Sequence, residues 1–201
     1  MQEIRTEALT KSYGEKMVFQ SLSLSFPAGK TTAIMAPSGW GKTTLLRVLM
    51  GLEMPDSGTI HGMNGLRKSA VFQEDRLCMH LDAADNVRLV TPGMTRVQAQ
   101  QALDDFGLRG CAKQLVRDMS GGQQRRVAIV RALLARWDVL FLDEPFRGLD
   151  IETRRQVLDD TCRRCVGRTV ILVTHDEAEA KAMHVHTILR FGSELQSNPK
   201  G

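Results

Sequence analysis

The sequence predicts an α/β fold with an antiparallel β subdomain near its start and a helical subdomain inserted at about 77–134. Three patterns support this: continuous apolar runs at 139–142 and 169–173, apolar alternation at 21–26, and helical spacing through much of 77–134. Continuous apolar runs are typical of parallel strands covered on both faces. Alternation is typical of a strand with one exposed face. The order of strands and helices is that of an α/β domain.

The predicted elements at the start of the chain lead into a glycine-rich loop. Residues 21–26 alternate serine with leucine or phenylalanine, which predicts a half-buried antiparallel strand. Residues 31–35 form a more fully buried strand that ends at the loop. Leucine and valine then recur at helical spacing through 45–52, and Gly51 weakens the end of this helix. A turn at 55–58 precedes a short β segment.

The composition excludes several classes of protein. With 42% apolar and 25% charged residues, the chain is not of a disordered, collagen-like or disulfide-dense type. A formal charge of +4 is too mild to indicate nucleic acid as a partner. No signal peptide is recognisable, and no apolar run approaches the ~20 residues that cross a bilayer. We expect one domain over 1–201, with any membrane association peripheral.

The cysteines include one C-x-x-C pair, Cys162 and Cys165. Such a pair can serve redox chemistry or half of a zinc site. A second pair is missing from the sequence, and the intervening Arg163 and Arg164 are typical of the exposed face of a helix. We interpret these cysteines as structural or incidental.

The glycine-rich loop has the context of a phosphate-binding loop, because it joins a predicted strand to a predicted helix. Its backbone N–H groups would surround phosphate oxygens, at the positive end of the helix. Lys42 would reach the β and γ phosphates, and the Thr43 hydroxyl would ligate Mg²⁺. Ala36 stands where the motif has its first glycine, so a chance glycine-rich turn is the alternative. The predicted nucleotide contacts in the loop are Ser38, Gly39, Trp40, Gly41, Lys42, Thr43 and Thr44.

An acidic pair, Asp143 and Glu144, follows the apolar run at 139–142. A carboxylate at the end of a buried strand beside the phosphate loop can hold Mg²⁺ through water, which is the role we predict for Asp143. Glu144 would orient and deprotonate the attacking water. The alternative is a strand that simply ends at the surface.

A third run resembles a family signature. Met119 to Arg126 read M-S-G-G-Q-Q-R-R directly before an apolar helical pattern, which resembles the signature of ABC-type ATPases, with Met119 where leucine is commoner. The family's remaining motifs follow in its order, and they are represented by Tyr13, Gln73, Gly148-Leu149-Asp150 and His175. The chain therefore resembles ABC transporter ATP-binding subunits over essentially its whole length. This resemblance implies a P-loop NTPase (RecA-like) core in a single ABC-type ATPase domain.

The resemblance also implies residue roles. Tyr13 would stack on adenine, a contact worth about 1–3 kcal/mol by analogy with other base–aromatic stacking. Gln73 would sense Mg²⁺ and the attacking water. His175 would hydrogen-bond the γ-phosphate and, with Lys42, Gln73 and Glu144, complete the catalytic set. Covering of a sheet edge is the alternative for Tyr13, and an ordinary residue at a strand end is the alternative for His175.

The signature implies a second copy of the chain as partner. The loop Ser120, Gly121, Gly122 and Gln123 begins a helix, so its N–H groups form another anion site. In this family that site caps the γ-phosphate held by the other copy, and Asp150 belongs to the same set of nucleotide contacts. ATP would therefore close a head-to-tail dimer, and hydrolysis would loosen it.

Residues 73–87 resemble the corresponding loop of nitrate, sulfonate and taurine importer ATPases, with Cys-Met-His where Leu-Pro-Trp is usual. This segment normally forms the groove for a membrane subunit. Leu77, Met79 and Leu81 are the exposed apolar candidates for that groove, with core packing as the alternative. The stretch 51–73 is shorter than usual, and we interpret it as a trimmed β-hairpin.

Taken together, the resemblance implies an ATP-hydrolysing subunit of an ABC importer that uses ATP and Mg²⁺. Its expected partners are a second copy, integral membrane permease subunits and an extracytoplasmic solute-binding protein, but no nucleic acid. Its expected location is peripheral, at the cytoplasmic face of the cell membrane. The alternatives are an ABC exporter ATPase, a non-transport ABC ATPase acting on a macromolecular complex, and a P-loop kinase or GTPase.

Overall fold

The computed structural model describes residues 2–192 and contains two β-sheets within them. The larger sheet has the strand order β5-β6-β7-β3-β8, and its neighbouring strands pair in parallel. Its strands are Lys68–Val71 (β5), Val139–Asp143 (β6), Thr169–Val173 (β7), Thr31–Met35 (β3) and Thr187–Arg190 (β8). The smaller sheet is antiparallel, in the order β2-β1-β4. Its strands are Ile4–Tyr13 (β1), Lys16–Phe26 (β2) and Ser57–His61 (β4). The predicted α/β class is confirmed.

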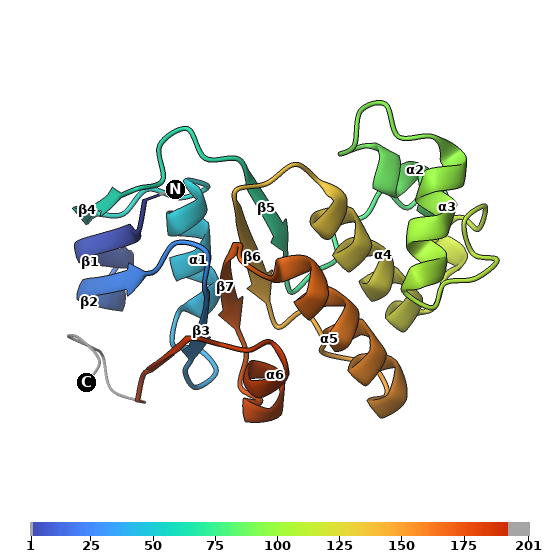
Figure 1. The fold of residues 1–201 in the computed structure, drawn as a ribbon. Coiled ribbons are helices and arrows are strands. Elements are labelled where there is room, and N and C mark those ends of the chain that lie inside the picture. Colours follow the sequence, from blue (N-terminus) through green and yellow to red (C-terminus); the bar gives the residue numbers. More distant parts are fainter. Residues whose placement is uncertain (1, 193–201) are drawn as a thin grey trace.

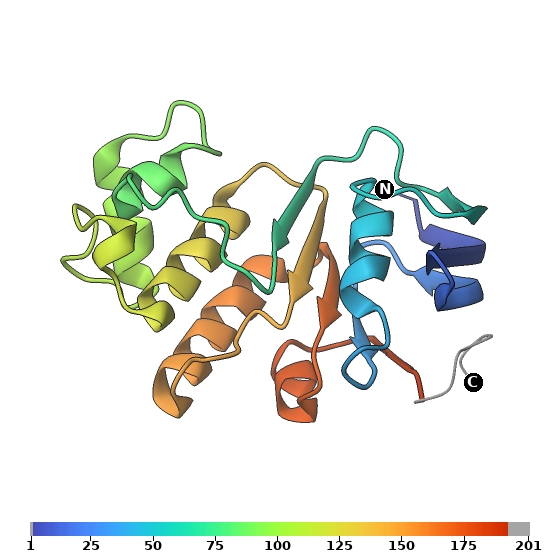
Figure 2. The same cartoon turned by 180° about the vertical axis from the view of Figure 1, so that it is seen from behind.

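The helices cover the parallel sheet on both faces. Figure 1 shows α1 (Lys42–Met50) between the two sheets, and α4 (Gly121–Leu134) and α5 (Ile151–Cys165) on the opposite side of the parallel sheet. Seen from behind in Figure 2, α2 (Ala83–Arg88) and α3 (Arg96–Asp105) lie at the far end of the molecule, beyond α4. The short helix α6 (Glu177–Ala182) follows β7. None of the helices within residues 2–192 is long and apolar enough to span a membrane.

The central strands are buried along their whole length because each contributes to two apolar clusters. Along β6, Leu140 and Leu142 join the cluster that contains residues of α4 and α5. Val139 and Phe141 of the same strand join the cluster that contains α1 and the antiparallel sheet. Side chains alternate between the faces of a strand, so a strand covered on both faces is apolar at most of its positions.

The helical block at 77–134 contains three α-helices and a 3₁₀ turn at Val116–Asp118. Its helices begin at capping residues. Thr95 starts α3 and Ser120 starts α4, each in a capping box with the glutamine three residues later. Both boxes satisfy N–H groups that a helix start leaves without partners. The helix α2 packs against α3 and α4, so the block has its own internal contacts.

The expected β-hairpin within 51–73 is wrong. The strand β4 pairs with β1, where Ile60 lies opposite Thr6, whereas β5 pairs in parallel with β6 in the other sheet. Arg67 explains the second pairing, because its backbone N–H and its guanidinium both donate to the Asp138 carboxylate just before β6. The chain between β4 and β5 therefore crosses from one sheet to the other.

Candidate functional site

The glycine-rich loop joins the end of β3 to the first turn of α1, as predicted. Gly39 and Gly41 have φ values of 80° and 105°, in the left-handed region that favours glycine. A Cβ at Gly41 would lie 2.3 Å from a methyl carbon of Val18, so glycine is also required sterically. Lys42 Nζ donates to the carbonyl oxygens of Ala36 and Pro37, at 2.8 Å and 3.0 Å, and this ties the loop into an arch.

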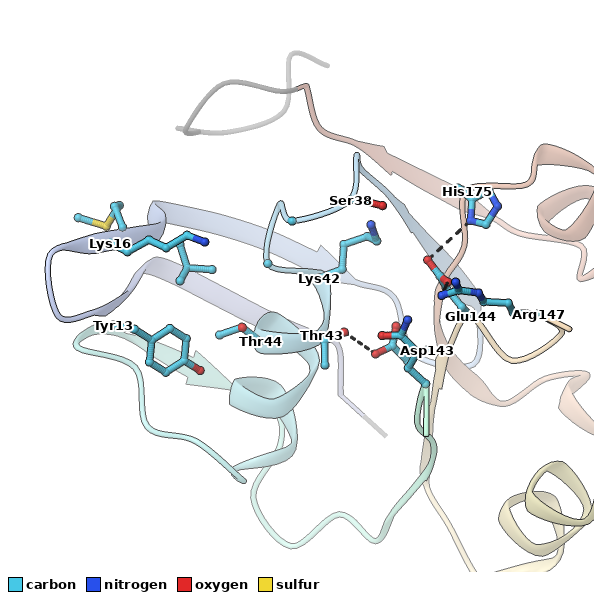
Figure 3. A pocket seen from close by; sticks show the side chains of 15 residues that line it. Tyr13, Lys16, Ser38, Lys42, Thr43, Thr44, Asp143, Glu144, Arg147 and His175 are labelled. Carbon is cyan, nitrogen blue, oxygen red and sulfur yellow. Dashed lines mark hydrogen bonds and ion pairs between the residues drawn. The ribbon is translucent and has the colours of Figure 1, made fainter. Parts of the chain in front are cut away.

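A cavity of about 720 Å³ opens above this loop. Its wall comes from the β1–β2 turn, the loop with α1, and the carboxyl ends of β6 and β7 (Figure 3). Eleven residues assigned from the sequence line it: Tyr13, Ser38, Gly39, Gly41, Lys42, Thr43, Thr44, Gln73, Asp143, Glu144 and His175. Segments from Tyr13 to His175 thus converge on one space, at the switch-point edge where α/β sheets bind ligands.

Thr43 and Asp143 form the oxygen-rich part of the cavity. Thr43 Oγ1 donates to Asp143 Oδ2 at 2.7 Å, a contact drawn as a dashed line in Figure 3. Burial raises the pKa of the Asp143 carboxyl, and the hydrogen bond from Thr43 opposes that rise. A hydroxyl and a buried carboxylate are the oxygen donors that a hard cation such as Mg²⁺ prefers. This pair therefore fits a magnesium site.

Glu144 lies at the end of β6 in an unusual backbone conformation. Its φ is 46°, and its N–H donates to Val173 O at 2.9 Å across the neighbouring strand. Its side chain is only 16% exposed, and it has a partner at each oxygen. Oε1 lies 3.6 Å from His175 Nδ1, and Oε2 lies 3.4 Å from Arg147 Nη1. The residues predicted as base and γ-phosphate ligand are therefore neighbours.

Tyr13 lies at the mouth of the cavity and is 49% exposed, as an aromatic that receives a flat ligand would be. Its hydroxyl donates to a carboxylate oxygen of Glu53, and this hydrogen bond raises the pKa of Tyr13. The tie to Glu53 limits the rotation of the ring.

The side chain of Trp40 does not face the cavity. It is buried between Phe19 and Phe191, with ring centroids 6.4 Å and 4.2 Å away. The backbone N–H of Trp40 donates to Pro37 O at 3.3 Å in the turn of the loop. Trp40 therefore anchors the loop to the core beneath it.

The signature residues lie elsewhere. Ser120 and Gln123 satisfy each other in the capping box of α4, and neither lines the 720 Å³ cavity. Gly121 and Gly122 line a different cavity of about 380 Å³. Asp150 is also outside the main cavity, where its carboxylate caps α5 by accepting from Thr153 N at 3.0 Å. This hydrogen bond lowers the pKa of Asp150.

Three positively charged residues of the site were not predicted. Lys16 and Arg147 line the main cavity, and the buried Arg125 lines the cavity of about 380 Å³ that also borders Gln73. The side chain of Lys16 has no hydrogen bond or ion pair within residues 2–192, and Lys16 pairs with Tyr13 at the start of β2, directly after the β1–β2 turn. Its closeness to Tyr13 in the sequence could have identified Lys16 as a residue of the site. Arg147 could have been found from its position three residues after Glu144.

Arg125 connects the loop of Gln73 with the acidic pair. Its guanidinium donates to Phe72 O at 2.6 Å and to Asp75 Oδ1 at 2.8 Å. On the other side it donates to Glu144 O at 2.6 Å and Pro145 O at 2.7 Å. The sequence showed only that Arg125 follows the signature, and gave no indication of these partners.

The C-x-x-C pair includes a thiol that is shielded from solvent. Cys165 is buried in the core, and burial raises its pKa to about 12, which keeps the thiol protonated and supports a structural role.

The predicted docking groove is only partly exposed. Of its three apolar candidates, Met79 is 40% exposed. Leu77 packs against the larger core cluster, so for this residue the alternative of core packing is confirmed.

Comparisons with known proteins agree with this geometry. A family model described as ABC transporter matches residues 19–147. The chain is 41% identical to a protein of Yersinia pestis bv. Antiqua named "Aliphatic sulfonates import ATP-binding protein SsuB", over 96% of this chain and 75% of the relative. It is also 41% identical to the Escherichia coli K12 protein of that name, over 90% of this chain and 74% of the relative.

A solved structure has the same fold. It is described as a dimeric, post-hydrolysis state of the ATP-binding cassette MJ0796 bound to ADP and Pi. The TM-score is 0.83 at 28% sequence identity, and the match covers 98% of this chain and 99% of the other.

Proposed function

This chain belongs to the ABC transporter family, and on that premise we propose that it is the ATP-binding and ATP-hydrolysing subunit of an importer. The observation that carries the proposal is the single cavity in which Lys42, the Thr43–Asp143 pair and Glu144 meet. A phosphate cradle, an oxygen-rich cation site and a carboxylate base are the parts that hydrolysis of a nucleoside triphosphate requires.

Different residues of the cavity bind different parts of MgATP. The loop amides and Lys42 hold the phosphates, with the amino end of α1 directed at the negative charge. Thr43 and Asp143 would hold Mg²⁺, which would supply positive charge to offset that of the phosphates, and Gln73 lines the same cavity. Tyr13 receives the adenine at the mouth.

Glu144 is the general base that takes the proton of the attacking water, and His175 beside it orients that water and the γ-phosphate. The low exposure of the Glu144 side chain supports this role, because a base shielded from bulk water acts on one bound water molecule. The backbone of Glu144 is held by Val173 and Arg125, so the carboxylate starts from a defined position.

The active assembly is a pair of copies. The signature loop of this chain opens on a different cavity from its own phosphate loop, so it is free to cap the nucleotide of another copy. The dimeric structural relative supports this arrangement. Asp150, at the start of α5, belongs to the same shared interface.

The transport role rests on the sulfonate import relatives. We assign this chain to the cytoplasmic face of the membrane, bound to permease subunits that are integral to it, with an extracytoplasmic solute-binding protein in the full system. A small anionic solute such as an aliphatic sulfonate is the proposed cargo class, from the names of those relatives.

Phosphate release from MgATP tests the enzymatic part. Glu144→Gln is expected to lower turnover by roughly 10²–10⁴-fold while ATP binding, measured by calorimetry, persists. Glu152→Gln, on the exposed first turn of α5, is the matched control and should behave as the unaltered chain. Unchanged turnover in Glu144→Gln would assign the base elsewhere.

Light scattering tests the assembly. The Glu144→Gln variant should dimerise in MgATP and remain monomeric in MgADP. A variant that stays monomeric with saturating MgATP, even with its membrane partners present, would reject the shared-site model. Uptake of a labelled sulfonate into vesicles that carry the permease tests the direction and the cargo, and ATP-driven efflux would favour an exporter.

A further inference from the structure

The Glu144 carboxylate has one partner at each oxygen. His175 Nδ1 lies 3.6 Å from Oε1, and Arg147 Nη1 lies 3.4 Å from Oε2. Figure 3 shows both side chains next to the carboxylate, at the edge of the cavity. A carboxylate contacted at both oxygens is restrained in rotation, whereas one contact leaves its plane free.

The backbone of Glu144 is held independently of the Arg147 side chain, although the Arg147 backbone N–H also donates to Glu144 O at 3.3 Å. Glu144 N–H donates to Val173 O, and its carbonyl oxygen accepts from Arg125 Nη2 at 2.6 Å. These contacts locate the Cα of Glu144 but leave its side-chain torsions unrestrained. The direction of the carboxylate therefore depends on His175 and Arg147.

Arg147 has no other side-chain partner among the described residues, and 63% of its side chain is exposed. Exposed ion pairs contribute little to folding stability. It also borders the cavity of the signature glycines and a third cavity, of about 170 Å³, next to Glu179. The Arg147 side chain therefore contributes little to folding stability, and its contact with the proposed base points to a role in the site.

We propose that Arg147 is a positioning residue that holds the Glu144 carboxylate in the direction from which it takes the proton of the attacking water. This inference rests on the proposed function of Glu144 as base. Arg147 acts through Glu144, so its removal should affect the chemical step more than ATP binding. A lysine at this position can still supply a cation near Oε2, without the planar fork of arginine.

The test compares steady-state ATP hydrolysis and ATP affinity in the full chain and in Arg147→Ala. The kcat is expected to fall about tenfold, with the Kd for ATP changed by less than about twofold. Arg147→Lys should recover a large part of the lost rate. Arg163→Ala is the matched control, because Arg163 is also exposed and also pairs with a carboxylate three residues away, in Asp160. It should leave turnover unchanged.

A double-mutant cycle supplies a readout that a structural role would not move. Adding Arg147→Ala to Glu144→Gln should change the residual single-turnover rate by less than about twofold, because the charged carboxylate is already absent. The inference is overturned if Arg147→Ala alone leaves kcat unchanged, if Kd rises as much as kcat falls, or if the Glu144→Gln background shows the same tenfold loss. A wild-type chain without any ATP hydrolysis would instead reject the proposed function, and the inference with it.

Discussion

Thr43 Oγ1 donates a 2.7 Å hydrogen bond to Asp143 Oδ2, which joins the first turn of α1 to the carboxyl end of β6. The two residues are 100 positions apart in the chain. Their contact joins the phosphate loop to the acidic pair at one edge of the parallel sheet. It also places a hydroxyl and a carboxylate oxygen side by side, as a Mg²⁺ site requires.

Asp143→Asn should weaken the response of the enzyme to Mg²⁺. Asparagine can still accept the hydrogen bond from Thr43, but it lacks the charge that a hard cation needs. We expect the Mg²⁺ concentration at half-maximal ATP hydrolysis to rise by about 10–100-fold, measured by titration at saturating ATP. The exposed Asp118→Asn is the control. An unchanged titration curve in Asp143→Asn would exclude this carboxylate from the cation site.

Lys16→Ala should raise the KM for ATP by about two- to fivefold and leave kcat unchanged. Lys16 lines the cavity with a solvent-exposed charge that lacks a protein partner within residues 2–192, so it can face a phosphate of the nucleotide. The effect should shrink at high salt, because exposed charges are screened. Lys113→Ala, an exposed lysine in the helical block, is the control. A fall in kcat with constant KM would contradict this role.

Arg125→Ala should destabilise the fold by about 3–5 kcal/mol. The buried guanidinium donates to six acceptors, and its loss leaves the carbonyl oxygens of Phe72 and Pro145 without a hydrogen-bond donor. Urea unfolding measures the change. The exposed Arg109→Ala should alter stability by less than about 0.5 kcal/mol. A loss below about 1 kcal/mol in Arg125→Ala would mean that water replaces the guanidinium.

Asp138→Asn should remove a pH-dependent part of the stability. Hydrogen bonds from Arg67 lower the pKa of Asp138 from 3.8 to about 2. A carboxyl with a lowered pKa in the folded state stabilises the protein above its unfolded pKa, and this contribution is lost as the pH falls through the folded pKa. The difference between the unaltered chain and Asp138→Asn should be constant near neutrality and vanish between pH 3.8 and about 2.

Urea midpoints at stepped pH values check this prediction. The exposed Asp159→Asn serves as control and should show no such pH-dependent difference. A difference that persists unchanged at pH 2 would show that the Arg67–Asp138 pair is not the cause.

Cys165 should resist thiol reagents in the native protein at pH 8. Burial raises its pKa to about 12, and the reactive species is the thiolate. Cys78 is exposed and should react first. Mass spectrometry of peptides after a short labelling pulse identifies the modified residues. Modification of Cys165 as fast as Cys78, before unfolding, would contradict its burial.

Much of the site could be predicted because its motifs are local. The phosphate loop needs glycines at fixed spacing, and Gly41 shows why, since a Cβ there would collide with Val18. The capping box of Ser120 and Gln123 is likewise contained within four residues. The apolar run at 139–142 identified β6, because a strand covered on both faces is largely apolar.

Other features could not be predicted. The strand β1 has no simple alternation, and its pairing with β2 shifts register at three points. The expected hairpin at 51–73 was wrong because its two strands belong to different sheets. The strand β4 pairs with β1 and β5 pairs with β6, and both partners lie outside this stretch. Arg125 looked like one more arginine after the signature, since all its partners lie 18 or more residues away.

The sequence by itself determined the family, the phosphate loop and the acidic pair, because these depend on residue types at short, fixed spacing. Only the tertiary structure decided which side chains share the cavity, that Arg147 and His175 hold opposite oxygens of Glu144, and that the signature glycines open on separate space. These relations depend on how distant strands stack in the sheet, and strand order follows from the packing of the whole chain.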